Sequence, residues 1–260
     1  MAPPSSPAQQ LMAYQLAVTQ VRASVLRYAE LSWGASRSYR DADIERLVAK
    51  LVPRVQAGQI RIADLTAVYL GNIEGSRKVL VDRDYITQGR GVPADEVYHR
   101  PANVVYDALA NGKAFDVALA MGANRLKSLV SMDMQMAKVR QSSASLQASN
   151  YEAYRRVLTG KESCGLCVIA STMSYSVKDL LPIHPGCDCD VAPIRSASQI
   201  PHVLDEELLE ATHDRVFDFT GDADRAGRAP DYKQLIIVHK HGEHGPSLRW
   251  RGEKFTGPTT

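Results

Sequence analysis

The sequence contains no apolar stretch close to the roughly 20 consecutive residues that a membrane-spanning helix requires. Its N-terminus, MAPPSSPAQQ, has neither the basic region nor the apolar region of a signal peptide. The formal net charge is only +2, so no overall field indicates binding to nucleic acid or to a membrane surface. Together these absences predict a protein that is cytosolic where it is made and has no membrane partner.

Cysteine is also scarce, and its four residues are concentrated in one segment. They form Cys164-x-x-Cys167 and Cys187-x-Cys189, and His184 lies just before the second pair. Thiolates and imidazole are the ligands that a tetrahedral Zn²⁺ prefers, and a C-x-x-C turn lets two sulfurs approach one ion. Neighbouring glycines and prolines supply the tight turns that this needs. The segment 161–193 therefore predicts a structural zinc knuckle.

Five donors compete for the four positions of such a site. On an extended segment Cys187 and Cys189 point to opposite faces, whereas His184 and Cys187 can meet around the intervening Pro-Gly turn. The preferred ligand set is Cys164, Cys167, His184 and Cys187, and Cys189 in place of either of the last two is the alternative. A filled site has no open position for water, so it favours a structural role over metal catalysis.

Two other interpretations concern the same kinds of donor. The cysteines could form two disulfides, which are uncommon in a reducing cytosol but can persist on an exported particle, or stay as four free thiols. Near the C-terminus, His239, His241 and His244 could bind a second metal. The glycine and proline residues around these histidines suit a hairpin turn equally well.

Residues 11–160 are expected to be largely helical, because apolar residues recur at steps of three and four. The first helix is expected to end near Ser32. Pro53 is expected to bend or end the second helix. Gly58 is expected to separate it from a third helix that covers residues 62–73.

The segment 79–86 favours a short strand or an extended loop, and Pro101 suits the first turn of another helix that Asn111-Gly112 ends. Residues 113–158 predict one very long helix or two in sequence, which suit a protein that braces itself against a larger assembly. An ordinary helical bundle with its own core explains the same stretch equally well. The sequence SSASLQAS is expected to break this stretch before Tyr151. Three alternating methionines are better explained by core filling than by contact with a partner: Met132, Met134 and Met136.

After the cysteines, the sequence predicts an acidic helix over 205–216, a linker over 218–231, and a strand over 234–239 with a partner over 247–250. The expected fold class is mainly α, with a long-helix N-terminal region followed by a small α+β domain stapled by the zinc-type knuckle. The predicted boundaries are a disordered arm, a helical docking region, a knuckle domain, and a linker with a β-hairpin tail, over residues 1–10, 11–160, 161–217 and 218–260.

The order C-x-x-C, then H-P-x-C-x-C, after a long helical region resembles the phage Mu protein F-like minor capsid (head morphogenesis) family. The segment that carries this resemblance is His184-Pro185-Gly186-Cys187-Asp188-Cys189, and the terminal HGEHGPSLRWRGEKFTGP resembles the tail of actinobacteriophage members. The resemblance covers residues 163–193 and the C-terminus, and over the first half it is only architectural. Family members carry a basic residue where this chain has Asp188, which weakens any contact of this loop with phosphate.

The resemblance implies a low-copy head protein that joins the portal during procapsid assembly and stays inside the virion, near the packaged genome. It implies a location in the host cytoplasm during assembly and in the capsid interior afterwards. The helices before Gly160 are then expected to bind the portal protein, or the scaffold and major capsid proteins. Contact with packaged DNA is the lesser expectation for the basic clusters of the chain.

A capsid maturation protease is the alternative, because related actinobacteriophage proteins encoded beside the portal are often described so. Its parts here are Ser171, Ser174 or Cys164 as nucleophile, His184 as base and Asp179 as orienting group. No G-x-S-x-G motif surrounds either serine. Metal binding already requires His184, and cap or turn hydroxyls explain the serines better.

A zinc-ribbon-like DNA-binding head protein is the second alternative. It predicts basic and aromatic residues around the knuckle. The sequence instead places Asp179, Asp188 and Asp190 there.

Overall fold

The computed structural model describes residues 6–36, 38–73, 78–158, 165–180, 189–195, 236–241 and 245–250. This part of the chain is mainly helical and has a small three-stranded sheet, as the sequence predicts at that level. The chain divides into two compact units. The first, called the helical unit, ends within the fifth helix at Gln141, and the second, called the sheet unit, contains Leu70–Val79 and the described residues from Ser142 onward.

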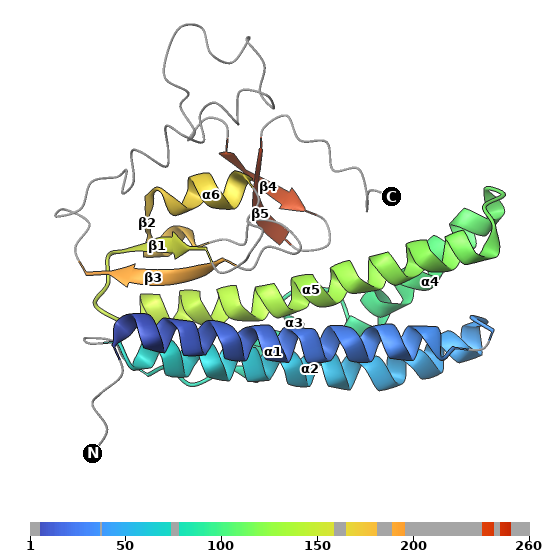
Figure 1. Ribbon diagram of the computed structural model, residues 1–260, viewed down its shortest axis with the longest axis horizontal. Helices are drawn as coiled ribbons and strands as arrows, with labels where there is room; N and C mark the ends of the chain where they lie inside the picture. Colours follow the sequence, from blue (N-terminus) through green and yellow to red (C-terminus); the bar gives the residue numbers. More distant parts are fainter. Residues whose placement is uncertain are drawn as a thin grey trace, which may run out of the picture. The chain divides into compact units, whose positions relative to one another are not determined.

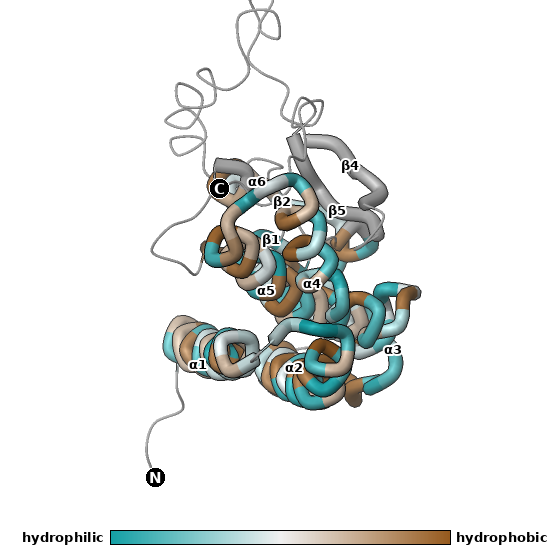
Figure 2. Tube along the Cα trace, turned by 90° about the vertical axis from the view of Figure 1, so that its right-hand side faces the viewer, coloured by the Kyte–Doolittle hydropathy of each residue, from teal (hydrophilic) through white to brown (hydrophobic). Residues whose placement is uncertain are grey.

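The helical unit contains the long helices of the chain (Figure 1). The long helices are α1 (Pro7–Gly34), α2 (Asp41–Gly71) and α5 (Phe115–Gln147), of which the unit contains α5 up to Gln141. The shorter α3 (Arg83–Gln88) and α4 (Ala94–Ala110) lie between α2 and α5 in the sequence. Helices α1 and α2 lie side by side and run in opposite directions (Figures 1 and 2). Between them the Tyr14 hydroxyl and Thr66 Oγ1 form a hydrogen bond of 2.9 Å, and the Tyr14 ring stacks on Tyr69 at a centroid distance of 4.4 Å.

Helix α1 begins earlier than expected, inside the segment predicted as an arm. The Gln9 backbone N–H donates to Ser6 Oγ at 3.2 Å, and the Ser6 N–H donates to Gln9 Oε1 at 2.8 Å. This capping box satisfies two backbone donors at the helix start, and Pro7 supplies a φ angle suited to the first turn. The apolar stripe of the sequence then faces inward, with Tyr14, Val18 and Val25 buried.

The expected break at Gly58 is wrong, and Pro53 does not end the helix: α2 continues through both residues to Gly71, close to the end expected for the third helix. Proline removes a hydrogen bond to the carbonyl four residues earlier, but Ala49 and Pro53 are exposed, so water can satisfy that carbonyl. At Gly58 an added Cβ would lie 2.6 Å from Val25 Cγ2 and 3.2 Å from Met134 Sδ. This glycine therefore lets α1 and α5 approach α2 and does not end the helix.

Two further expectations differ from the structure, and a third is confirmed. Residues 83–88 form α3 and no strand, with Asp82 accepting a hydrogen bond from the Tyr85 N–H at 3.1 Å as its N-cap. Helix α4 begins at Ala94, so Pro101 lies inside it. Its predicted end is confirmed, because Asn111 is the C-cap and Gly112 has a φ of +75°, which glycine adopts without strain.

Helix α5 is one long helix of 33 residues that ends at Gln147, within the SSASLQAS break. Met132, Met134 and Met136 are all buried, which confirms core filling. Residues 132–142 are buried without interruption, so all sides of this stretch are covered and its polar residues need internal partners. In the described residues no helix has both the length and the apolar content that a bilayer span demands.

Asp133 is one of these buried charged residues, and both of its carboxylate oxygens accept hydrogen bonds. Arg90 Nε donates to Asp133 Oδ1 at 2.7 Å, and the Tyr98 hydroxyl donates to Asp133 Oδ2 at 2.6 Å. Arg140 Nη1 donates to the Ile86 carbonyl at 2.8 Å. Burial lowers the pKa of Arg140, and the attraction to Asp133 opposes part of this shift.

The sheet unit contains a three-stranded antiparallel sheet and a separate hairpin. The sheet order is β2-β1-β3, with β1 (Ala153–Val157) between β2 (Ser174–Ser176) and β3 (Asp190–Ile194). The helical expectation for 151–158 is therefore wrong: tyrosine and valine favour strands, and both neighbours pair with β1. The predicted C-terminal pair is confirmed, as β4 (Ile236–His241) and β5 (Gly245–Trp250) pair antiparallel.

Some expectations fall outside the described residues. These are the acidic helix over 205–216, the linker over 218–231 and most of the arm over 1–10.

We predict that Gly122→Ala destabilises the protein by about 1–3 kcal/mol, the usual cost of overpacking. A Cβ at Gly122 would lie 2.6 Å from Trp33 Cζ2 and 2.9 Å from the Pro101 carbonyl oxygen, which is backbone and cannot rotate away. Gly34→Ala is the matched control, because nothing lies within 4 Å of its added Cβ. Thermal unfolding should show a lower Tm for Gly122→Ala and an unchanged or higher Tm for Gly34→Ala; equal effects would contradict this packing.

We predict that Asp133→Ala costs about 3–5 kcal/mol, because it leaves the Arg90 guanidinium buried without its carboxylate. The two side chains of this pair are only 5% and 6% exposed. Glu30→Ala is the control: Glu30 and Lys127 are half exposed and 3.8 Å apart, so its loss should change stability by less than about 1 kcal/mol. Urea unfolding of both variants measures the difference, and similar values for the two would contradict the assigned role of Asp133.

Candidate functional site

The predicted zinc segment begins and ends at neighbouring strands of the small sheet. Strand β1 pairs with β3 in the register Ala153↔Ile194 to Val157↔Asp190, and with β2 from Ala153↔Ser176 to Arg155↔Ser174. Helix α6 (Gly165–Ser171), which carries Cys167, packs against β1. Strand β2 follows the first cysteine pair in the sequence, and β3 begins one residue after Cys189. The two strands that flank β1 therefore each follow one of the cysteine pairs.

The structure describes two of the five predicted metal ligands. Cys167 is 3% exposed and Cys189 is 4% exposed, so both thiols are inside the sheet unit. Cys164, His184 and Cys187 lie outside the described residues. Within the described ranges, no group of three or more His, Cys, Asp or Glu side chains is placed to hold a metal ion. Burial and thiol chemistry of the two described cysteines fit a zinc site, and the remaining ligands stay a prediction.

A buried arginine contacts the last of these cysteines. Arg156, in the middle of β1, is 2% exposed, and its Nη1 donates to Cys189 Sγ at 3.3 Å. Its guanidinium lies 5.9 Å from the ring centroids of both Tyr154 and Tyr175, which stack on each other at 5.4 Å. A planar guanidinium suits this place, because it can stack on aromatic rings and donate in its own plane.

The electrostatics of this cluster follow from its burial. Burial alone lowers the pKa of Arg156, but the adjacent Cys189 sulfur and the two tyrosines reverse the effect, so the pKa of Arg156 is raised overall. Burial raises the pKa of the Tyr175 hydroxyl, and the Arg156 charge opposes part of that shift. Arg156 therefore stays positively charged beside Cys189.

The residues of the alternative protease interpretation do not form a triad in the described part of the chain. Ser171 Oγ donates to the Val168 carbonyl at 2.6 Å, which is the cap role expected for this serine at the end of α6. Ser174 is half-buried at the start of β2. The Asp179 side chain and the whole of His184 lie outside the described residues, so their predicted roles are not addressed.

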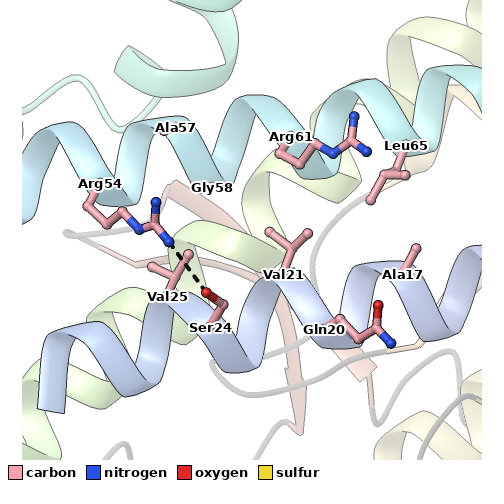
Figure 3. A pocket seen from close by; sticks show the side chains of 10 residues that line it. All are labelled: Ala17, Gln20, Val21, Ser24, Val25, Arg54, Ala57, Gly58, Arg61 and Leu65. Carbon is pink, nitrogen blue, oxygen red and sulfur yellow. Dashed lines mark hydrogen bonds between the residues drawn. The ribbon is translucent and has the colours of Figure 1, made fainter. Parts of the chain in front are cut away.

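A second feature, in the helical unit, was not anticipated from the sequence. A groove of about 360 Å³ runs along the contact of α1 with α2 (Figure 3). Its floor is apolar and includes Val21, Val25 and Leu65. Ala57 and Gly58 have small side chains, which leave the space open on the α2 side. Small residues at 57 and 58 are the sequence signal for it, but Gly58 also resembles an ordinary helix break.

Comparisons with known proteins give no match: none was found among protein-family models, curated proteins or solved structures.

We predict that Arg156→Lys destabilises the protein by about 1–3 kcal/mol, because lysine cannot both stack on the tyrosine rings and donate to Cys189. Arg155→Lys is the matched control on the same strand, since Arg155 is exposed and its replacement should cost less than about 0.5 kcal/mol. Differential scanning calorimetry compares the two. Equal transitions for both variants would show that the buried stacking contributes nothing.

Proposed function

We propose that this chain is a minor capsid (head morphogenesis) protein of a tailed bacteriophage, associated with the portal and the procapsid interior during assembly and DNA packaging. The observation that carries the proposal is the cysteine motif together with its setting. The order C-x-x-C, H-P-G-C-D-C resembles the Mu F-like family, and its described cysteines are both buried beside one short sheet.

The helical unit supports a docking role for the N-terminal half. Its three long helices have 28, 31 and 33 residues, whereas the mean helix of a globular protein has about 11. Such helices present long, continuous faces to a partner. The portal protein is the partner we propose first, and scaffold or major capsid protein the next.

Zinc has a structural role in this proposal. Cys164, Cys167, His184 and Cys187 would hold the ion, or Cys189 in place of either of the last two. A closed site of this kind contributes folding free energy to the segment that binds it. The Cys189 sulfur accepts a hydrogen bond from Arg156, which is compatible with either ligand set.

We predict about one zinc ion per chain in protein purified from minimal medium, measured by elemental analysis. Cys167→Ser should remove the zinc and cost several kcal/mol, because metal binding and folding are linked in such sites. Unfolding should then affect the sheet unit first. Ser171→Ala, on the same helix, is the control and should keep its zinc. A zinc-free wild-type chain of unchanged stability would contradict the structural metal.

Co-expression with the portal protein of the same genome tests the function itself. The full chain should co-purify with the portal, and neither scaffold nor major capsid protein should be cleaved in its presence. Failure of the wild-type chain to bind the portal would count against the head-assembly role. Cleavage that Ser171→Ala or His184→Ala abolishes would establish the protease instead.

A further inference from the structure

The groove between α1 and α2 has one strongly basic rim (Figure 3). Arg54 and Arg61 line it on α2, while Gln20 and Ser24 line the α1 side. Arg54 Nη2 reaches across toward Ser24 Oγ at 3.4 Å, and its guanidinium lies 5.7 Å from the Tyr28 ring centroid. In the described part of the chain, neither Arg54 nor Arg61 is within ion-pair distance of a carboxylate.

The sequence around the groove strengthens this positive character. Residues 7–29 of α1 and residues 46–63 of α2 contain no aspartate or glutamate. The same ranges contain only basic charges, at Arg22, Arg27, Arg46, Lys50, Arg54 and Arg61. Arg46 pairs with Asp43, and Glu30 and Asp64 lie one residue beyond these ranges. The cations that line the groove itself are Arg54 and Arg61, and their charge favours an acidic partner.

The geometry of the rim limits the form of that partner. Arg54 and Arg61 are seven positions apart, so they stand about 10.5 Å apart along the axis of α2. A second helix that lies along the groove repeats this spacing when its own carboxylates are seven residues apart. The floor is apolar and about 360 Å³ in volume, which is room for a few side chains of one helix face. The hydrogen-bond donors of the groove lie on its rim, and the apolar floor offers a phosphate backbone no further contact.

We propose that this groove docks an amphipathic α-helix of a partner protein. The apolar face of that helix enters between α1 and α2, and its carboxylates pair with Arg54 and Arg61. The inference names the docking surface of the helical unit and rests on the proposed head-assembly function for the existence of a protein partner. Rim charges set specificity and association rate in such a contact, and the apolar floor supplies the buried area.

The test uses the full-length chain and a synthetic helical peptide as probe. The peptide carries leucine and alanine at steps of three and four, and glutamates seven residues apart on the flank of that face. A second peptide has lysine in place of each glutamate. Fluorescence anisotropy of the labelled peptides measures binding. The chain should bind the glutamate peptide at least about tenfold more tightly than the lysine peptide.

Two groove variants should each weaken binding of the glutamate peptide about tenfold or more. Arg54→Glu with Arg61→Glu reverses the rim charge, and Ala57→Leu fills the floor. Both sets of positions are exposed, and circular dichroism checks that helix content and Tm are retained.

The matched controls make the same changes away from the groove. Arg83→Glu with Lys113→Glu alters the net charge equally at exposed positions, and Ala49→Leu adds the same side chain to an exposed position of α2. Binding to these controls should stay within about twofold of wild type.

Three outcomes overturn the proposal: no binding of the glutamate peptide, equal binding of both peptides, or equal binding to groove and control variants. Duplex DNA that binds through Arg54 and Arg61 while the peptide does not would overturn it in favour of a phosphate site. The peptide assay contains no phage protein, so its failure counts against the groove alone. Failure of the wild-type chain to bind the portal counts against the proposed function alone.

Discussion

The central strand of the sheet unit, β1, is the constraint on which the proposed metal centre depends. It pairs with β2 on one edge and β3 on the other, and α6 packs against it. Its Arg156 is enclosed by two stacked tyrosines and reaches Cys189. Burying the Arg156 guanidinium costs desolvation free energy unless a partner offsets it. The Cys189 sulfur that accepts its hydrogen bond offsets part of this cost. The strand thus fixes where Cys189, the last residue of the second cysteine pair, lies relative to the sheet.

In the helical unit, one stretch of α5 is buried around its whole circumference, so its polar side chains cannot rely on water for hydrogen bonds. Residues 132–141 of α5 include charged and amide side chains, whose burial is costly unless they find hydrogen-bond partners. Asp133 meets this requirement through Arg90 and Tyr98, and Arg140 through a backbone carbonyl. Close approach of the neighbouring helices then depends on glycines, at Gly58 and Gly122. Not every polar group of this stretch is satisfied, because the buried Gln135 amide has no hydrogen-bond partner among the described residues.

Local patterns in the sequence predict the buried faces of the long helices and the end of α4 well, and they predict helix beginnings and long-range contacts poorly. The three-and-four spacing predicts α1 and α5, and Asn111-Gly112 predicts the end of α4, because these signals depend on neighbours in the chain. Pro53 and Gly58 suggest helix breaks that do not form. The burial of apolar residues on either side of them outweighs their unfavourable helix propensity. Strand β1 is missed because five residues carry too little periodicity, and its pairing partners lie far along the chain.

The two parts of the candidate site differ in the same way. The cysteine spacing predicts a metal site without knowledge of the fold, because cysteine and histidine side chains are themselves the ligands. The partners of Arg156, and the groove beside Arg54 and Arg61, exist only once separate segments meet. What the sequence does show of the groove is the acid-free stretches of α1 and α2. Such charge patterns indicate a docking face more reliably than any single residue.

The central claim is that a closed set of sulfur and nitrogen donors makes the sheet unit a rigid block in a virus-assembly protein. X-ray absorption at the zinc edge of the purified full chain tests it most directly. The account predicts a four-coordinate shell with sulfurs at about 2.3 Å and nitrogen at about 2.0–2.1 Å. A shell of oxygen and nitrogen alone, or one with an open water position, would contradict it.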